Sequence, residues 1–136
     1  MDVKINAAIL AAMATALAAG INAGAAAPEI KFYTGTKPAG PATAISTQTL
    51  LGTLVCSDPA VVASGAVVTF DAIAPDTSAD ASGTATWARI LDGDGTAVID
   101  VDVSNAAGTG VIKLNTVTIV ASGLIQITSF TLTVGG

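Results

Sequence analysis

Hydrophobic residues follow two different patterns along the chain, and the pattern changes at Pro28. In the first 27 residues, large apolar side chains recur every four positions among alanines, at Ile5, Ile9, Met13, Leu17 and Ile21. Side chains four residues apart lie one above another on a helix, so this spacing predicts a helix with a narrow apolar ridge. Gly20, Gly24 and Pro28 predict its end.

Residues 1–27 allow three interpretations. The ridge fits a helix docked on the rest of the chain or on a partner, since burial stabilises each large side chain by about 1.5–3 kcal/mol. Lys4, the apolar middle and the small residues of "AGAAA" also resemble a secretory signal peptide. The length suits a membrane span, but alanine is weakly hydrophobic and Asn6 and Asn22 interrupt the run. We favour the docked helix and expect no membrane partner.

Beyond Pro28 the chain consists of short apolar runs separated by Gly, Pro, Asp and Ser. Eight runs have the length and residue types of strands: 29–35, 50–56, 66–73, 84–91, 97–104, 110–114, 116–121 and 124–134. They predict a mainly β domain over residues 28–136, an eight-stranded antiparallel β-sandwich of jelly-roll type. In the last run the apolar positions change parity near Thr128 and Ser129, which predicts a β-bulge or a change of sheet.

The stretch "TGTKPAGPATAISTQ", residues 34–48, is too long for a tight turn. Its prolines and glycines predict an exposed loop or arm. We expect this loop to contact a partner, with Lys37, Pro38 and Pro41 as candidate contact residues.

Composition narrows the possible functions. Hydrophobic residues make up 51% of the chain and charged residues 11%, well below the usual charged fraction, which suggests a surface that contacts neighbouring subunits. The five basic residues are scattered and the net charge is −5, so we expect no nucleic-acid partner. The chain has no histidine, which removes the commonest general base and metal ligand. The single cysteine, Cys56, lies in an apolar run and is expected to be a buried thiol.

The segment "RILDGDGTAVIDVDV", residues 89–103, contains four aspartates and invites comparison with a calcium loop. Counting from Asp92, Asp94 matches the third ligand position, but Thr96 and Val103 stand at the fifth and twelfth. Asp-Gly pairs between two β-type runs are typical of hairpin turns. A β-type calcium site remains the alternative, and we favour the hairpin without a metal.

Asp100 and Asp102 share one face of the strand that follows, with Cβ atoms about 7 Å apart. Such a pair suits a glycosidase, but the chain has few aromatic residues to stack on a sugar. We favour a solvated face that discourages edge-to-edge association, and expect neither an enzyme site nor a cofactor. Ile99, Val101 and Val103 alternate with these aspartates and are expected in the core.

Trp87 and Arg89 fall on one face of the preceding strand. Two interpretations are open. The tryptophan belongs to the core or is half-exposed, or the two residues form a subunit contact, where Trp and Arg concentrate binding energy.

Four stretches resemble small virion structural proteins of tailed bacteriophages: "FYTGTKPA", "LLGTL", "DTSADASGTATWARILDGDGTAVIDVDV" and "LNTVTIVASGLIQITSFTLTV". The resemblance extends over residues 5–134, and its most specific part is Asp76 to Asp102. These proteins also begin with an alanine-rich helix, and no catalytic motif accompanies them. This chain departs from them in a longer Pro/Gly loop near residues 37–44, where contacts would differ.

The resemblance implies a capsid decoration or cement protein on the virion surface. Its expected partners are the major capsid protein, which it would clamp across adjacent capsomers, and further copies of itself. A neck, tail or head-fibre component is the first alternative. The second is a secreted carbohydrate-binding or adhesin domain, with residues 1–27 as its signal.

Overall fold

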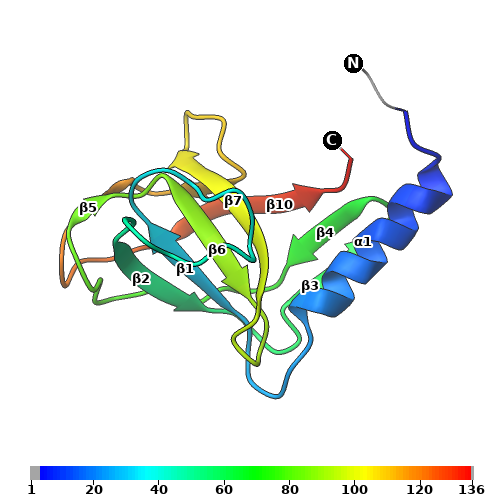
Figure 1. The fold of residues 1–136 in the computed structure, drawn as a ribbon, viewed down its shortest axis with the longest axis horizontal. Coiled ribbons are helices and arrows are strands. Elements are labelled where there is room, and N and C mark those ends of the chain that lie inside the picture. The colour runs from blue at the N-terminus through cyan, green and yellow to red at the C-terminus, as the bar shows by residue number, and fades with distance from the viewer. Residues whose placement is uncertain (1–3, 136) are drawn as a thin grey trace.

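A computed structural model describes residues 4–135 and contains one helix and ten strands in that range (Figure 1). The helix, α1, spans Ala7–Ile21. The strands are β1 (Glu29–Tyr33), β2 (Leu50–Val55), β3 (Val61–Ser64), β4 (Val67–Phe70), β5 (Gly83–Thr84), β6 (Trp87–Leu91), β7 (Ala97–Asn105), β8 (Ile112–Leu114), β9 (Thr118–Ile119) and β10 (Ile127–Thr133). The predicted mainly β chain with an N-terminal helix is confirmed, but β3 was not among the predicted strands, and the predicted strand 84–91 is divided into the end of β5 and all of β6.

Eight strands form one sheet in the order β2-β1-β6-β7-β8-β10-β4-β3, and β5 pairs with β9 in a second, two-stranded sheet. The large sheet curls into a half-barrel (Figure 1). Its neighbours are antiparallel except β7 and β8, which run parallel. The chain therefore shows one curled, mixed sheet rather than the predicted antiparallel jelly-roll sandwich.

The connection between β7 and β8 explains this difference. The chain turns after Asn105 and returns beside β7 in the same direction, so that Ile112 pairs with Val103. Two backbone N–H groups hold the turn: that of Gly108 donates to the Asn105 carbonyl, and that of Gly110 donates to the Ser104 hydroxyl, 2.9 Å away. A connection of this length between two strands is usual in a hairpin. Here the chain reverses direction twice within it, so β8 runs parallel to β7.

The inner face of the curled sheet carries a single hydrophobic core. Alternate residues of the strands supply it, including Ile30, Phe32, Leu54, Ile90, Val68 and Leu132. Val101 and Val103 are buried in it and Ile99 packs against it at half exposure, so the predicted inward face of β7 is confirmed.

The predicted irregularity in the last strand is a β-bulge. The register of β10 against β8 shifts between Ile127 and Ser129. The Thr128 hydroxyl, at the extra residue, donates to the Lys113 carbonyl over 3.1 Å. After the bulge, β10 pairs with β4, and Phe130 stacks on Phe70 with ring centroids 4.3 Å apart.

Helix α1 docks on β3 and β4, but through a face that includes only Leu17 and Ile21 of the predicted ridge. Ala14, Ala18 and Ile21 are buried, whereas Ile9 and Met13 are 54% and 44% exposed. The reason is geometric. Ile5 precedes α1, and at 3.6 residues per turn each step of four residues advances about 40° around the helix, so Ile9 and Ile21 are separated by about 120°. The five ridge residues therefore cannot all face one surface.

Asn22 connects the end of α1 to the sheet. Its side-chain oxygen accepts the backbone N–H groups of Ala60 and Val61 at 2.8 and 3.2 Å, and its amide nitrogen donates to the Val61 carbonyl at 3.0 Å. The sequence pattern treated Asn22 as an interruption of an apolar run. In the structure it sets the position of the helix relative to β3.

The thiol of Cys56 is buried, as predicted. Burial, reinforced by the nearby Glu29 carboxylate, raises the pKa of Cys56 to about 12. A thiol with this pKa is almost entirely protonated at neutral pH, and the thiolate is the reactive form.

We therefore expect Cys56 in the folded protein to react with a disulfide reagent at pH 8 at least about 10³-fold more slowly than an ordinary cysteine, because the thiolate fraction falls by that factor. Absorbance of the released chromophore measures the rate. The same protein in concentrated guanidinium chloride is the control and should react completely within minutes. Fast reaction of the folded protein would show that the thiol is accessible.

Candidate binding surfaces

The loop of residues 34–48 folds back over the outer face of β6 and β7, and Figure 1 shows it crossing these strands. Three side chains donate to backbone carbonyls at its beginning, and one of these donors, Gln48, lies at its other end. The Trp87 indole N–H donates to the Thr34 carbonyl at 3.1 Å, the Thr86 hydroxyl donates to the Gly35 carbonyl at 2.6 Å, and the Gln48 amide donates to the Thr36 carbonyl at 2.6 Å. The predicted loop is therefore anchored along its length and is not an extended arm.

Arg89 fixes the middle of the loop. Its guanidinium forms a bidentate pair with Asp100, with Nε–Oδ1 and Nη2–Oδ2 distances of 2.8 and 3.0 Å. Nη1 and Nη2 also donate to the carbonyls of Thr43 and Gly40 at 2.9 and 3.2 Å. The side chains of Arg89 and Asp100 are only 7% and 4% exposed. The hydrogen bond to Asp100 raises the pKa of Arg89.

Two aromatic rings lie beside this ion pair. Trp87, 1% exposed, stacks on Tyr33 with centroids 4.7 Å apart, and the Arg89 guanidinium lies 5.4 Å from the Trp87 ring. Burial raises the pKa of the Tyr33 hydroxyl. The Arg89 guanidinium lowers this pKa by less than burial raises it, and the Asp100 carboxylate raises it slightly further. Trp87 and Arg89 are thus covered by the protein's own loop, and neither presents the exposed surface that the proposed subunit contact requires.

The two aspartates of β7 have different environments, which corrects the expectation that both face solvent. Asp102 does, and its carboxylate lies 2.9 Å from the Lys37 ammonium, with side-chain exposures of 66% and 37%. Asp100 is buried against Arg89. Each carboxylate is paired with its own cation, so the two do not form an acid–base pair directed at a common substrate position.

The sequence indicated only part of this cluster. Arg89 and Asp100 lie on the two strands of the predicted hairpin, but uninterrupted pairing across a turn at residues 92–96 would place Arg89 opposite Ile99, and the register shift between Ile90 and Leu91 places it opposite Asp100. Cross-strand pairs of opposite charge are common on a sheet face. The pattern gave no sign that residues 34–48 would cover that face. Of the predicted loop contacts, Lys37 is exposed, while Pro38 and Pro41 are half-buried.

The Asp92–Thr96 segment is the hairpin turn between β6 and β7, as predicted. One carboxylate oxygen of Asp92 accepts the N–H groups of Asp94 and Thr96, both at 2.9 Å. The turn also contacts the linker after α1, since the Gly93 N–H donates to the Ala23 carbonyl at 2.8 Å. Across residues 4–135, no three acidic or cysteine side chains are grouped in a way that would hold a metal ion.

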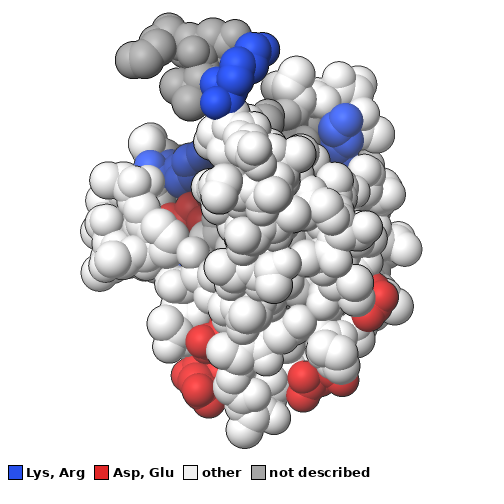
Figure 2. All heavy atoms as spheres, turned by 90° about the vertical axis from the view of Figure 1, so that its right-hand side faces the viewer, with Lys and Arg blue, Asp and Glu red and all other residues white. Residues whose placement is uncertain are grey.

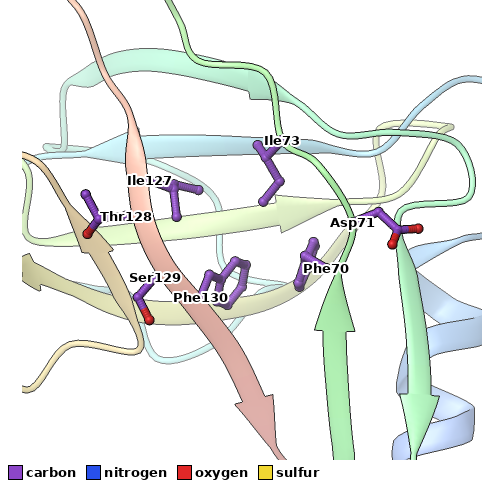
Figure 3. A pocket seen from close by; sticks show the side chains of 7 residues that line it. All are labelled: Phe70, Asp71, Ile73, Ile127, Thr128, Ser129 and Phe130. Carbon is purple, nitrogen blue, oxygen red and sulfur yellow. The ribbon is translucent and has the colours of Figure 1, made fainter.

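Two hollows open on the sheet. The first, about 190 Å³, lies at the β10 bulge (Figure 3), where Phe70, Ile73, Ile127 and Phe130 line it and Asp71 points away from them. The second, about 490 Å³, lies between β7 and β10, because β8 pairs only with the last three residues of β7. Its lining is Ile99, Val101, Gly110, Val111, Lys113, Ser129, Thr131, Leu132 and Thr133. Neither lining places a nucleophile beside a general base.

The outward face of α1 is a second exposed surface, distinct from the loop. Ile9 and Met13 lie on it, exposed Ile5 precedes the helix by two residues, and residues 5–28 contain no charged side chain. Figure 2 shows α1 toward the viewer as a broad uncharged band with acidic and basic groups at its margins. Within the described range, no helix is long and apolar enough to cross a membrane.

Comparison of the chain with protein families, curated proteins and solved structures found no match.

Proposed function

We propose that this chain is a non-enzymatic structural protein of a bacteriophage virion, of the capsid decoration or cement type. The residues 34–48 loop would be the surface that binds the major capsid protein. The proposal is supported by the resemblance of the sequence to phage virion proteins and by one structural observation: an irregular loop of this length is held in place by the buried Arg89–Asp100 pair.

This anchoring favours a binding role on physical grounds. A loop that is ordered before binding loses less conformational entropy when it meets a partner, so more of the contact energy contributes to affinity. Apart from Lys37, its exposed residues are small, mostly Ala, Thr and Ser. Small side chains suit close contact with a flat shell and cost little rotamer entropy on burial.

A neck, tail or head-fibre component would use the same surface, and the number of copies per particle separates these roles. A carbohydrate-binding domain has less support. Sugars stack on exposed aromatic rings, but the aromatic residues of this chain are buried except for half-buried Phe70. These are Phe32, Tyr33, Phe70, Trp87 and Phe130.

Binding of the purified protein to shells of the phage's major capsid protein tests the proposal. We expect co-sedimentation of the wild type and a loss of at least about tenfold in affinity for the Ala42→Asp/Ala44→Asp variant, because two buried carboxylates would lack partners. Both alanines are exposed in the loop. Ala106→Asp/Ala107→Asp, the same change in the exposed β7–β8 turn, is the matched control and should bind like the wild type. Failure of the wild type to bind, or equal binding by both variants, would refute the proposed role of the loop.

A further inference from the structure

The outward face of α1 has an apolar centre and opposite charges at its two ends. At the N-terminal end, Lys4 precedes the helix by three residues and is exposed. Among the residues that the structure describes, Figure 2 shows basic side chains only in the upper part of this face, where α1 begins, and acidic side chains mainly in the lower part, where α1 ends. The face is therefore polarised along the helix axis.

Backbone contacts place three exposed aspartates at the C-terminal end. Asn22, which caps α1, binds Ala60, and the Asp71 N–H donates to the Ala60 carbonyl at 2.9 Å. Asp58 lies two residues before Ala60. Asp94 follows Gly93, whose N–H donates to Ala23 just beyond the helix.

These charges are poorly matched to α1 itself. The C-terminal end of a helix carries partial negative charge and the N-terminal end partial positive charge. The first turn of α1 has no acidic residue and the last turn has no basic one. The helix dipole is thus uncompensated by side chains in either terminal turn, and the three aspartates add negative charge at its negative end.

We propose that the α1 face binds the α1 face of a second copy of this chain, with the two helices antiparallel about a two-fold axis. Lys4 of each copy then approaches the acidic end of the other, and the two helix dipoles oppose one another. A parallel pair would place like charges together at both ends. This inference concerns a different surface from the capsid-binding loop and does not depend on that function.

A second copy suits the centre of the face as well. Exposed Ile9 and Met13 are flanked by exposed alanines at positions 8, 12 and 16, and small residues allow two helices to approach closely. Because the centre is uncharged on both copies, pairing there buries no unpaired charge. A 15-residue helix is about 22 Å long, so the contact is smaller than that of a permanent dimer. We expect reversible self-association in roughly the micromolar range.

Analytical ultracentrifugation of the full chain over a range of concentrations tests the pairing. The wild type should shift from monomer to dimer on concentration. Ile9→Lys/Met13→Lys should raise the dimer dissociation constant at least about tenfold, because the contact would then bury ammonium groups. Val120→Lys/Leu124→Lys adds the same charge at two exposed apolar residues outside α1 and should leave the constant unchanged. A monomeric wild type, or equal effects of both variants, would overturn the proposal.

Charge reversal tests the antiparallel direction. Lys4→Glu alone and Asp71→Lys/Asp94→Lys alone should each weaken the dimer, and the triple variant should recover most of the loss because attraction returns with reversed sign. Thermal unfolding followed by circular dichroism verifies that each variant is folded. In a parallel dimer the two residues at position 4 would lie together. Lys4→Glu would then replace two neighbouring positive charges with two neighbouring negative charges and leave the dissociation constant unchanged. An unchanged constant for that variant, or no recovery in the triple variant, would overturn the antiparallel arrangement.

Discussion

Replacing Arg89 with alanine is expected to destabilise the protein by about 3–5 kcal/mol, the usual effect of removing one partner of a buried ion pair. The Asp100 carboxylate, 4% exposed, would keep its charge without a partner, and the carbonyls of Gly40 and Thr43 would lose their donors. Guanidinium unfolding monitored by Trp87 fluorescence and circular dichroism measures the loss. Hydrogen exchange should also accelerate in residues 36–47, because the loop loses its central anchor.

Two controls separate the ion pair from other effects. Arg89→Met/Asp100→Leu removes both charges and should cost less than Arg89→Ala alone, since no unpaired charge remains buried. Lys37→Ala breaks the exposed pair with Asp102 and should cost less than about 1 kcal/mol. A loss below about 1 kcal/mol for Arg89→Ala, with unchanged loop exchange, would show that the pair does not hold the loop.

Replacing Gly93 with alanine is expected to cost about 3 kcal/mol, from steric overlap and loss of a hydrogen bond. A Cβ atom at this position would overlap the Ala26 carbonyl, which is backbone and cannot rotate away. The turn would have to move from the linker and lengthen the bond between the Gly93 N–H and the Ala23 carbonyl. The same unfolding measurement gives the loss, and hydrogen exchange of α1 should rise because the linker follows that helix.

Gly40→Ala is the matched control, because a Cβ atom there has no neighbour within 4 Å. Its effect should lie within about 0.5 kcal/mol of zero. Gly95→Ala is an intermediate case: it has open space but a φ of +84°, and should cost about 1 kcal/mol from backbone strain alone. Equal, small effects at Gly93 and Gly40 would show that the turn and the linker are not in tight contact.

These two predictions arise where the sequence and the structure differ most. The sequence pattern predicted Asp92–Thr96 as a hairpin turn, and the β6–β7 register confirms it. The pattern did not predict that the turn would pack against residues 23–26. Asp-Gly pairs favour a turn locally, whichever surface lies beside it, so local preference carries no information about that contact.

The outer face of β7 shows the same limit. Alternation correctly separated Val101 and Val103 from Asp100 and Asp102. We predicted that the face with Asp100 and Asp102 is solvated, because two aspartates on a strand usually face water. Arg89 and the folded-back loop bury the Asp100 side chain, and this depends on 15 residues whose composition indicates only a loop.

The sequence by itself determined the local structure of this protein: the N-terminal helix, most strands, the β6–β7 turn, the β10 bulge and the buried Cys56. These features depend on residue spacing and backbone preference over a few positions, which a linear pattern contains. Only the tertiary structure decided the curled mixed sheet, the side of α1 that docks, and the covering of Trp87, Arg89 and Asp100. The parallel β7–β8 pair depends on a turn within residues 104–114 that the pattern did not indicate. The other features depend on contacts between segments far apart in the chain, whose free energy no local pattern expresses.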